Sequence, residues 1–107
     1  MQSVRLVGEN WAGAPAQIAT SPIDYWRGIK GVAGGSALIL RRRAVHTMGL
    51  TTPLRGVGLD ASGTVMMVKT MWPNRFFYFP SAVYLVEFPV ELQPPRPGTR
   101  IAMIRDD

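Results

Sequence analysis

Residues 56–68 read GVGLDASGTVMMV, and they carry the clearest structural signal in the chain. Two apolar runs, 56–59 and 64–68, flank the short connection Asp60-Ala61-Ser62-Gly63. An aspartate at the start and a glycine at the end of so short a connection are typical of a tight turn between two strands. The stretch therefore predicts a β-hairpin.

Further short strands are predicted on both sides of this hairpin, from alternating or continuous apolar residues. They cover residues 3–6, 36–43, 75–79, 82–88 and 100–104. The segment 36–43 ends in three consecutive arginines. These cannot all be buried, so they predict a sheet edge, a barrel rim or a contact surface. Residues 8–20 are rich in Gly, Ala and Pro, and they are predicted to form mostly loop.

One short helix is predicted near residues 22–30. Ser21 can cap its free amides, Pro22 suits the first helical position, and Asp24 favours the positive end of the helix dipole. Glycines from Gly28 onward end it early. Trp26 is expected to dock this helix on a sheet.

The pattern as a whole predicts a mainly β fold. Many short strands at close spacing with one helix indicate a small barrel-like or sandwich domain of short antiparallel strands. No repeat or linker divides residues 1–107, so a single domain is expected.

Composition excludes several classes of protein. The chain has no cysteine, which excludes thiolate metal sites, cysteine nucleophiles and disulfides. Hydrophobic residues make up 47% of it, which argues against intrinsic disorder. The first residues have no apolar signal-peptide core, and no run approaches the roughly 20 apolar residues of a membrane-spanning helix. A soluble, cytoplasmic protein without a transmembrane segment is therefore expected.

The positive charge is confined to one half of the chain. Residues 1–55 hold seven Lys or Arg against two acids, which gives +5, and residues 56–107 hold five of each, which gives 0. Such asymmetry indicates an acidic partner surface, nucleic acid or anionic lipid, although it also serves solubility.

An ordered set of short motifs runs through most of the chain. They are Arg27-Gly28-Ile29, Ala37-Leu38-Ile39-Leu40, Val45-His46-Thr47-Met48-Gly49, Pro53-Leu54, Leu59-Asp60-x-x-Gly63-x-Val65, Pro73-x-Arg75 and Glu87. This order resembles the uncharacterised bacterial and archaeal family catalogued as domain of unknown function 192, over residues 22–104. The resemblance implies a small β-rich fold with a short helix and no established activity. Its marker positions are His46, Thr47, Met48, Gly49, Asp60, Gly63 and Glu87. Many relatives have an acid where this chain has Arg55.

No arrangement of residues predicts catalysis, a metal or a cofactor. His46 is the only histidine, and a metal site would need it to combine with Asp60, Glu87 or water, which is a poor donor set for a transition metal. A structural histidine that hydrogen-bonds the backbone near the bend before Gly49 is the simpler interpretation. Asp60 and Glu87 could form a carboxylate pair, but the turn already explains Asp60.

The leading hypothesis is a non-enzymatic binding or accessory module that docks on a protein assembly with an acidic surface, with a membrane surface as a further candidate. The residues expected to make this contact are arginines and exposed aromatics. They are Arg41, Arg42, Arg43, Arg55, Trp72, Arg75, Phe77 and Phe79.

Two other functions stay open. A small barrel with basic and aromatic residues could bind single-stranded nucleic acid through stacking. A small-ligand or enzymatic site around His46 is the second alternative.

Overall fold

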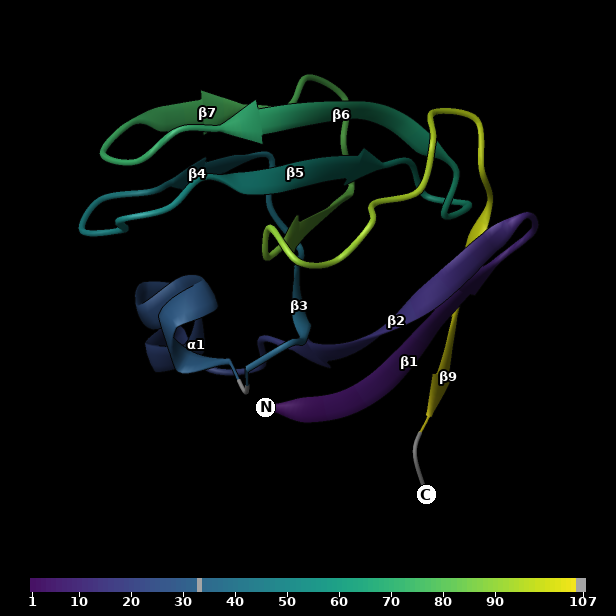
Figure 1. The fold of residues 1–107 in the computed structure, drawn as a ribbon, viewed down its shortest axis with the longest axis horizontal. Coiled ribbons are helices and arrows are strands. Elements are labelled where there is room, and N and C mark those ends of the chain that lie inside the picture. Colours follow the sequence, from purple (N-terminus) through teal and green to yellow (C-terminus); the bar gives the residue numbers. More distant parts are fainter. Residues whose placement is uncertain (33, 106–107) are drawn as a thin grey trace.

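The chain forms a mainly β fold with one short helix, as the sequence predicts (Figure 1). The computed structural model describes residues 1–32 and 34–105. The strands are β1 (Gln2–Gly8), β2 (Trp11–Ile18), β3 (Ala37–Leu40), β4 (Ala44–His46), β5 (Leu54–Leu59), β6 (Val65–Met71), β7 (Phe76–Tyr78), β8 (Tyr84–Phe88) and β9 (Ile101–Arg105). The helical elements are α1 (Pro22–Arg27) and a 3-10 turn, η1 (Gly28–Gly31). Within these residues no helix has the length and apolar character needed to cross a membrane.

Seven strands form one curved sheet in the order β6-β5-β8-β3-β2-β1-β9, and β4 and β7 form a separate two-stranded sheet. In Figure 1, β5 and β6 lie across from β1 and β2, and β3 runs between the two halves. The amide of Val65 bonds to the carbonyl of Thr99, and the amide of Ile101 to that of Gly63. These bonds bring the two ends of the sheet together locally, but the sheet is not closed into a barrel.

The two faces of the large sheet bury separate hydrophobic cores. The inner core fills the space between the two halves and includes Leu6, Ile39, Val57, Leu59, Val86 and Phe88. The outer core includes Leu38, Leu40, Leu54, Met71, Phe79 and Leu85, and side chains of β4, β7 and the helical segment cover it. Side chains of β3 alternate between the two cores, which is why this strand is buried on both faces.

The predicted β5–β6 hairpin is confirmed. Asp60 Oδ1 accepts hydrogen bonds from the Ser62 amide at 2.9 Å, the Ser62 hydroxyl at 2.6 Å and the Thr64 amide at 3.0 Å. These bonds, the Ser62 hydroxyl first, lower the pKa of the Asp60 carboxyl. Gly63 closes the turn at φ +87°, a conformation that favours glycine.

The prediction of loop over residues 8–20 is wrong, because most of this segment is strand β2. It pairs antiparallel with β1 and parallel with β3, so the sheet is not purely antiparallel. Ala14 and Ala16 are buried in the inner core. Small side chains fill the core here, and they give none of the bulky alternation that indicates a strand.

The prediction that the arginines extend a strand is also wrong. Strand β3 ends at Leu40, and Arg41, Arg42 and Arg43 form the bend through which the chain passes to β4. All three are exposed. Their predicted position at a surface is therefore confirmed, although not within a sheet.

The predicted helix is confirmed at its start. The Ser21 hydroxyl accepts a bond from the Asp24 amide, and the Asp24 carboxylate accepts one from the Ser21 amide, which completes a capping box. The bond from the Thr20 amide is the main cause of the lowered pKa of Asp24. The expectation for Trp26 is wrong, because its side chain is 81% exposed. Tyr25 and Ile29, four residues apart, pack against the outer core instead.

Candidate binding surface

The two-stranded sheet of β4 and β7 presents one face to solvent and the other to the outer core. Its register pairs Ala44 with Tyr78 and His46 with Phe76. Residues opposite each other share a face, so these side chains point outward together. Phe76 is 77% exposed and Tyr78 56% exposed. The rings of His46 and Phe76 have centroids 6.1 Å apart.

The expectation that Phe77 and Phe79 are exposed is wrong. Phe77 is half-buried against the outer core, and Phe79 is completely buried in it. Side chains alternate along a strand, and the register here turns the odd-numbered rings inward. The exposed aromatics of residues 72–79 are therefore Phe76 and Tyr78, together with Trp72 in the turn before β7, whose exposure was predicted. We call His46, Trp72, Phe76 and Tyr78 the aromatic face.

Thr47 fixes the turn that carries Trp72 and Arg75. Its buried hydroxyl donates to the Trp72 carbonyl at 2.6 Å and accepts from the Arg75 amide at 3.0 Å. Its own amide and carbonyl bond to Arg75 and Asn74, and the Gly49 amide donates to the Asn74 side chain. Thr47 and Gly49 therefore hold this turn against the end of β4.

His46 has the structural role that the sequence predicts. Its Nδ1 accepts a hydrogen bond from the Met48 amide at 3.2 Å, within the bend before Gly49. The ring is exposed, and its Nε2 is the nitrogen left for another contact. In the described parts of the chain, no three residues of the His, Asp and Glu types lie close enough to hold a metal ion.

We expect Thr47→Val to lower the free energy of unfolding by about 1–3 kcal/mol, because the carbonyl of Trp72 and the amide of Arg75 lose their buried partner. Urea unfolding measures the loss, and hydrogen exchange of the Arg75 amide reports the loosened turn. The control is Thr51→Val at an exposed position. A Thr47→Val protein as stable as the control would contradict this role.

Basic side chains surround the aromatic face. The Arg42 guanidinium stacks 4.3 Å from the centre of the Tyr25 ring, and Arg43 Nε donates to the Ala82 carbonyl. Lys69 Nζ donates to the carbonyl of Tyr78 itself. Arg55 faces the opposite side of the sheet, because it alternates with Leu54 and Gly56 of the outer face. The structure thus does not bring Arg55 to the surface that the sequence predicts.

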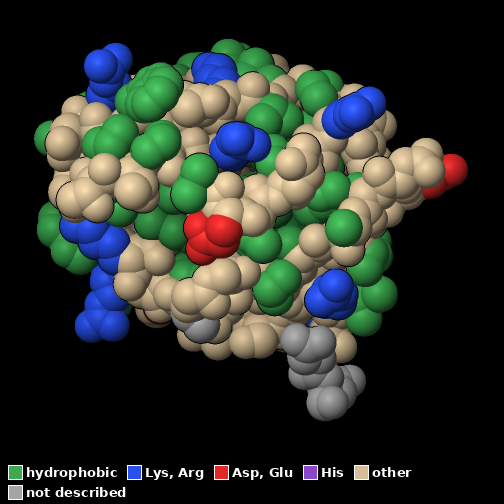
Figure 2. All heavy atoms as spheres, in the orientation of Figure 1, with side chains coloured by type: hydrophobic (Ala, Val, Ile, Leu, Met, Phe, Trp, Pro, Cys, Tyr) green, Lys and Arg blue, Asp and Glu red, His purple; other side chains and the backbone are tan. Residues whose placement is uncertain are grey.

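The charge of this region is one-sided. Residues 25–86 contain Arg27, Lys30, Arg41, Arg42, Arg43, Arg55, Lys69 and Arg75 against the single acid Asp60. Figure 2 shows several Lys and Arg side chains along the edge of the molecule that carries α1, β4 and β7, and one acidic group nearer the centre of this face. Asp60 itself is held by its own turn.

The two candidate carboxylates are not brought together. Glu87 pairs with Gly56, four residues before Asp60, or roughly 13 Å along the strand. Glu87 faces the outer core, and burial alone raises the pKa of its carboxyl to about 7. A Cβ on Gly28 would lie 3.8 Å from Oε1 of Glu87, which places this acid beneath the end of the helix.

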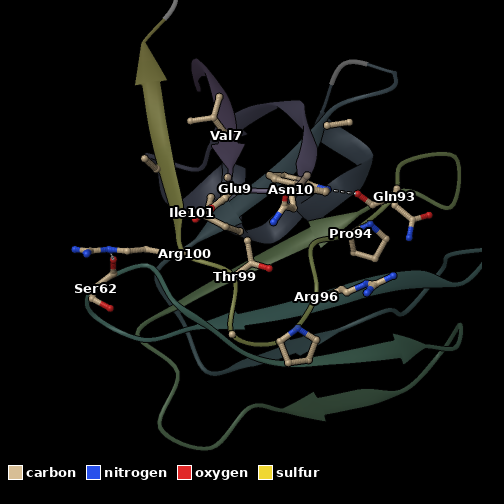
Figure 3. Close-up of a pocket in the computed structure, with 16 residues that line it drawn as sticks. Val7, Glu9, Asn10, Ser62, Gln93, Pro94, Arg96, Thr99, Arg100 and Ile101 are labelled. Atoms are coloured by element: carbon tan, nitrogen blue, oxygen red, sulfur yellow. Dashed lines mark hydrogen bonds between the residues drawn. The ribbon is translucent and has the colours of Figure 1, made fainter.

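The structure also contains an open groove of about 1290 Å³ that the sequence did not indicate. Figure 3 shows it between the β1–β2 turn, with Glu9 and Asn10, and the segment from Gln93 to Ile101. Trp11 Nε1 donates to the Gln93 carbonyl across one end, and Arg100 Nε donates to the Ser62 carbonyl. The groove depends on two distant segments, so no local pattern could have revealed it. Ser62 at its wall donates its hydroxyl to Asp60 at 2.6 Å, as part of the β5–β6 turn.

The comparisons with known proteins support the fold alone. The sequence matches no protein-family model and no curated protein. A proposed transcription regulator from Sinorhizobium meliloti 1021 has a similar structure, with a TM-score of 0.69 and 16% identity over 95% of this chain and 92% of that one. A protein of unknown function from Novosphingobium aromaticivorans DSM 12444 has a TM-score of 0.69 and 12% identity, over 94% and 83% of the two chains.

Proposed function

We propose that this protein is a non-enzymatic binding module that docks through the aromatic face on an acidic surface of a partner protein. The observation that carries the proposal is the pair Phe76 and Tyr78, side by side and exposed on a strand pair that Thr47 braces. The cytoplasmic location and the membership of the family resembled above belong to this proposal as predictions.

The exposed rings supply the affinity in this proposal. Aromatic side chains bury large areas and dominate the energetics of protein contacts, and arginine accompanies them in such interfaces. The sheet holds Phe76 and Tyr78 in fixed positions, so little conformational freedom is lost on binding.

The surrounding charge selects the partner. Apart from Arg55, which faces the other side of the sheet, residues 25–86 contain seven bases against one acid. This charge favours association with an acidic surface and repels a basic one. Arg41 and Arg42 are exposed in the segment that leads into β4, and Arg75 is exposed in the segment that leads into β7. Salt is therefore expected to weaken the complex.

The test places a photo-crosslinking phenylalanine analogue at position 72, at the exposed Trp72, and compares the otherwise wild-type chain with Phe76→Ser/Tyr78→Ser in extracts of the source organism. We expect one partner with an acidic surface to be crosslinked, and its capture by the double variant to fall at least about tenfold. Val90→Ser is the matched control, because Val90 is similarly exposed and lies after β8, outside the aromatic face. Equal capture by all variants would refute the proposal. Capture that salt does not weaken would also refute it.

Single-stranded nucleic acid is the second candidate, because exposed rings beside cations also form stacking platforms. The relation to a proposed transcription regulator adds support at the level of the fold. Fluorescence anisotropy with labelled oligothymidine and oligouridine at about 50 and about 200 mM salt decides between the two. Nucleic acid is favoured if the oligonucleotides bind wild type, if salt weakens this binding, and if the double variant loses it. Absence of binding at low salt excludes nucleic acid as the partner. Flotation with anionic vesicles tests a membrane surface in the same way.

A further inference from the structure

Strand β9 has a free edge beyond Ile101 in the part of the chain that the structure describes. It pairs with β1 on one side, and it is the last strand of the sheet. The Ile101 amide donates to the Gly63 carbonyl on the other side. Backbone groups alternate in direction along a strand, so the amide and carbonyl of Met103 face this free edge, whereas those of Ala102 and Ile104 face β1.

An apolar pocket of about 200 Å³ opens beside this edge, on the inner face of the sheet. Leu6, Leu59, Val86 and Ile101 line it from four different strands, and Met103, half exposed, forms part of its rim. An apolar cavity of roughly 150 Å³ accommodates benzene. The pocket therefore has room for one large apolar side chain.

Exposed arginines lie at both ends of the free edge, because Arg100 precedes β9 and Arg105 ends it. In the sequence Asp106 and Asp107 follow Arg105, so the surplus of positive charge is at the Arg100 end. Arg5 of β1 pairs with Ile104 close by. Asp60 lies in the turn of the β5–β6 hairpin, which lines the pocket. Its Oδ1 already accepts three hydrogen bonds within that turn. This arrangement complements a segment with an apolar residue for the pocket and an acid on the side of Arg100.

We propose that β9 binds an extended segment of a partner protein as an added strand, with one bulky apolar side chain in the pocket and an acidic residue near Arg100. Main-chain bonds to Met103 supply affinity, and the pocket supplies specificity. Residues 98–101 already pair with the start of β6, which leaves only the end of β9 for any added strand. A second copy of this chain would use the same edge, and the test below includes it as an outcome.

A random heptapeptide library displayed on phage tests the proposal on the full chain. We expect the enriched sequences to share one bulky apolar residue with an acidic residue on one side of it. Synthetic peptides with that residue changed to alanine should bind at least about tenfold more weakly by fluorescence anisotropy.

Two neighbouring variants separate the pocket from the strand surface. Met103→Glu, at the pocket rim, should weaken the selected peptide at least about tenfold, because it places an acid beside an acid. Ile104→Glu has a similar exposure and does not line the pocket, so it should bind within about twofold of wild type. Thermal unfolding verifies that both variants fold.

The proposal is overturned if every selected peptide binds Met103→Glu as tightly as wild type. The same holds if peptides with alanine in place of the bulky residue bind as tightly as the selected ones. It is also overturned if sedimentation shows self-association that Met103→Glu abolishes, because the occupant is then a second copy. Neither variant changes Phe76 or Tyr78, so the result is independent of the aromatic face.

Discussion

Wild-type protein is expected to lose about 3 kcal/mol of its free energy of unfolding as the pH rises from about 4.5 to about 8, and Glu87→Gln should remove this loss. Glu87 is the last residue but one of β8, is 3% exposed and faces the outer core. Burial raises the pKa of its carboxyl to about 7, so removing the proton leaves a buried charge.

The sign follows from the direction of this shift. The folded protein holds the proton more tightly than the unfolded chain, whose carboxyl has its ordinary pKa of about 4.5. Stability is therefore full below pH 4.5 and falls as the pH rises through 7. Asp24 and Asp60 have lowered pKa values, so the stability they contribute is lost only as the pH falls through their folded values. Their effect lies below the window of Glu87.

Urea unfolding at about pH 4.5, 6 and 8 measures the effect. Glu87→Gln should match wild type at low pH and exceed it by about 3 kcal/mol at about pH 8, because the amide stays neutral. Glu91→Gln, at an exposed position, should keep the wild-type profile. A flat wild-type profile, or the same slope in Glu87→Gln, would show that the folded protein opens to hydrate this carboxylate.

Features that depend on neighbouring residues could be predicted from the sequence. The turn at Asp60 and the helix start at Ser21 need only bonds within a few residues, and both are present. The outward position of Arg41, Arg42 and Arg43 was also predictable, because three consecutive cations cannot be buried. Trp72 lies in a turn and is exposed as well, as predicted. These local signals account for the hairpin, the helix and part of the candidate surface.

Features that depend on packing could not be predicted in this way. Residues 76–79 are all aromatic, so both faces of the strand look equally apolar, and only the pairing with β4 decides that Phe76 and Tyr78 point outward. A glutamate is ordinarily exposed, so the burial of Glu87 follows only from the helix that covers it. The groove and the β9 pocket arise where distant segments meet.

Gly63→Ala is expected to lower the free energy of unfolding by about 3 kcal/mol or more. Gly63 has φ +87°, which disfavours any side chain, and a Cβ there would lie 2.5 Å from the Ile101 carbonyl oxygen. That oxygen belongs to the backbone segment whose bonds to residues 63–65 join the ends of the sheet. Relieving the clash must therefore move either the hairpin or the start of β9, and it disrupts both.

Two other glycines separate the causes of this loss. Gly98 has φ +90° but open space around it, so Gly98→Ala should cost only the strain of the backbone, about 1 kcal/mol. Gly34 has open space and no such conformation, so Gly34→Ala should change stability by less than about 0.5 kcal/mol. Urea unfolding of the three variants at one pH gives the comparison. If Gly63→Ala costs no more than Gly98→Ala, the contact with Ile101 yields freely, and residues 98–101 do not hold the two ends of the sheet together.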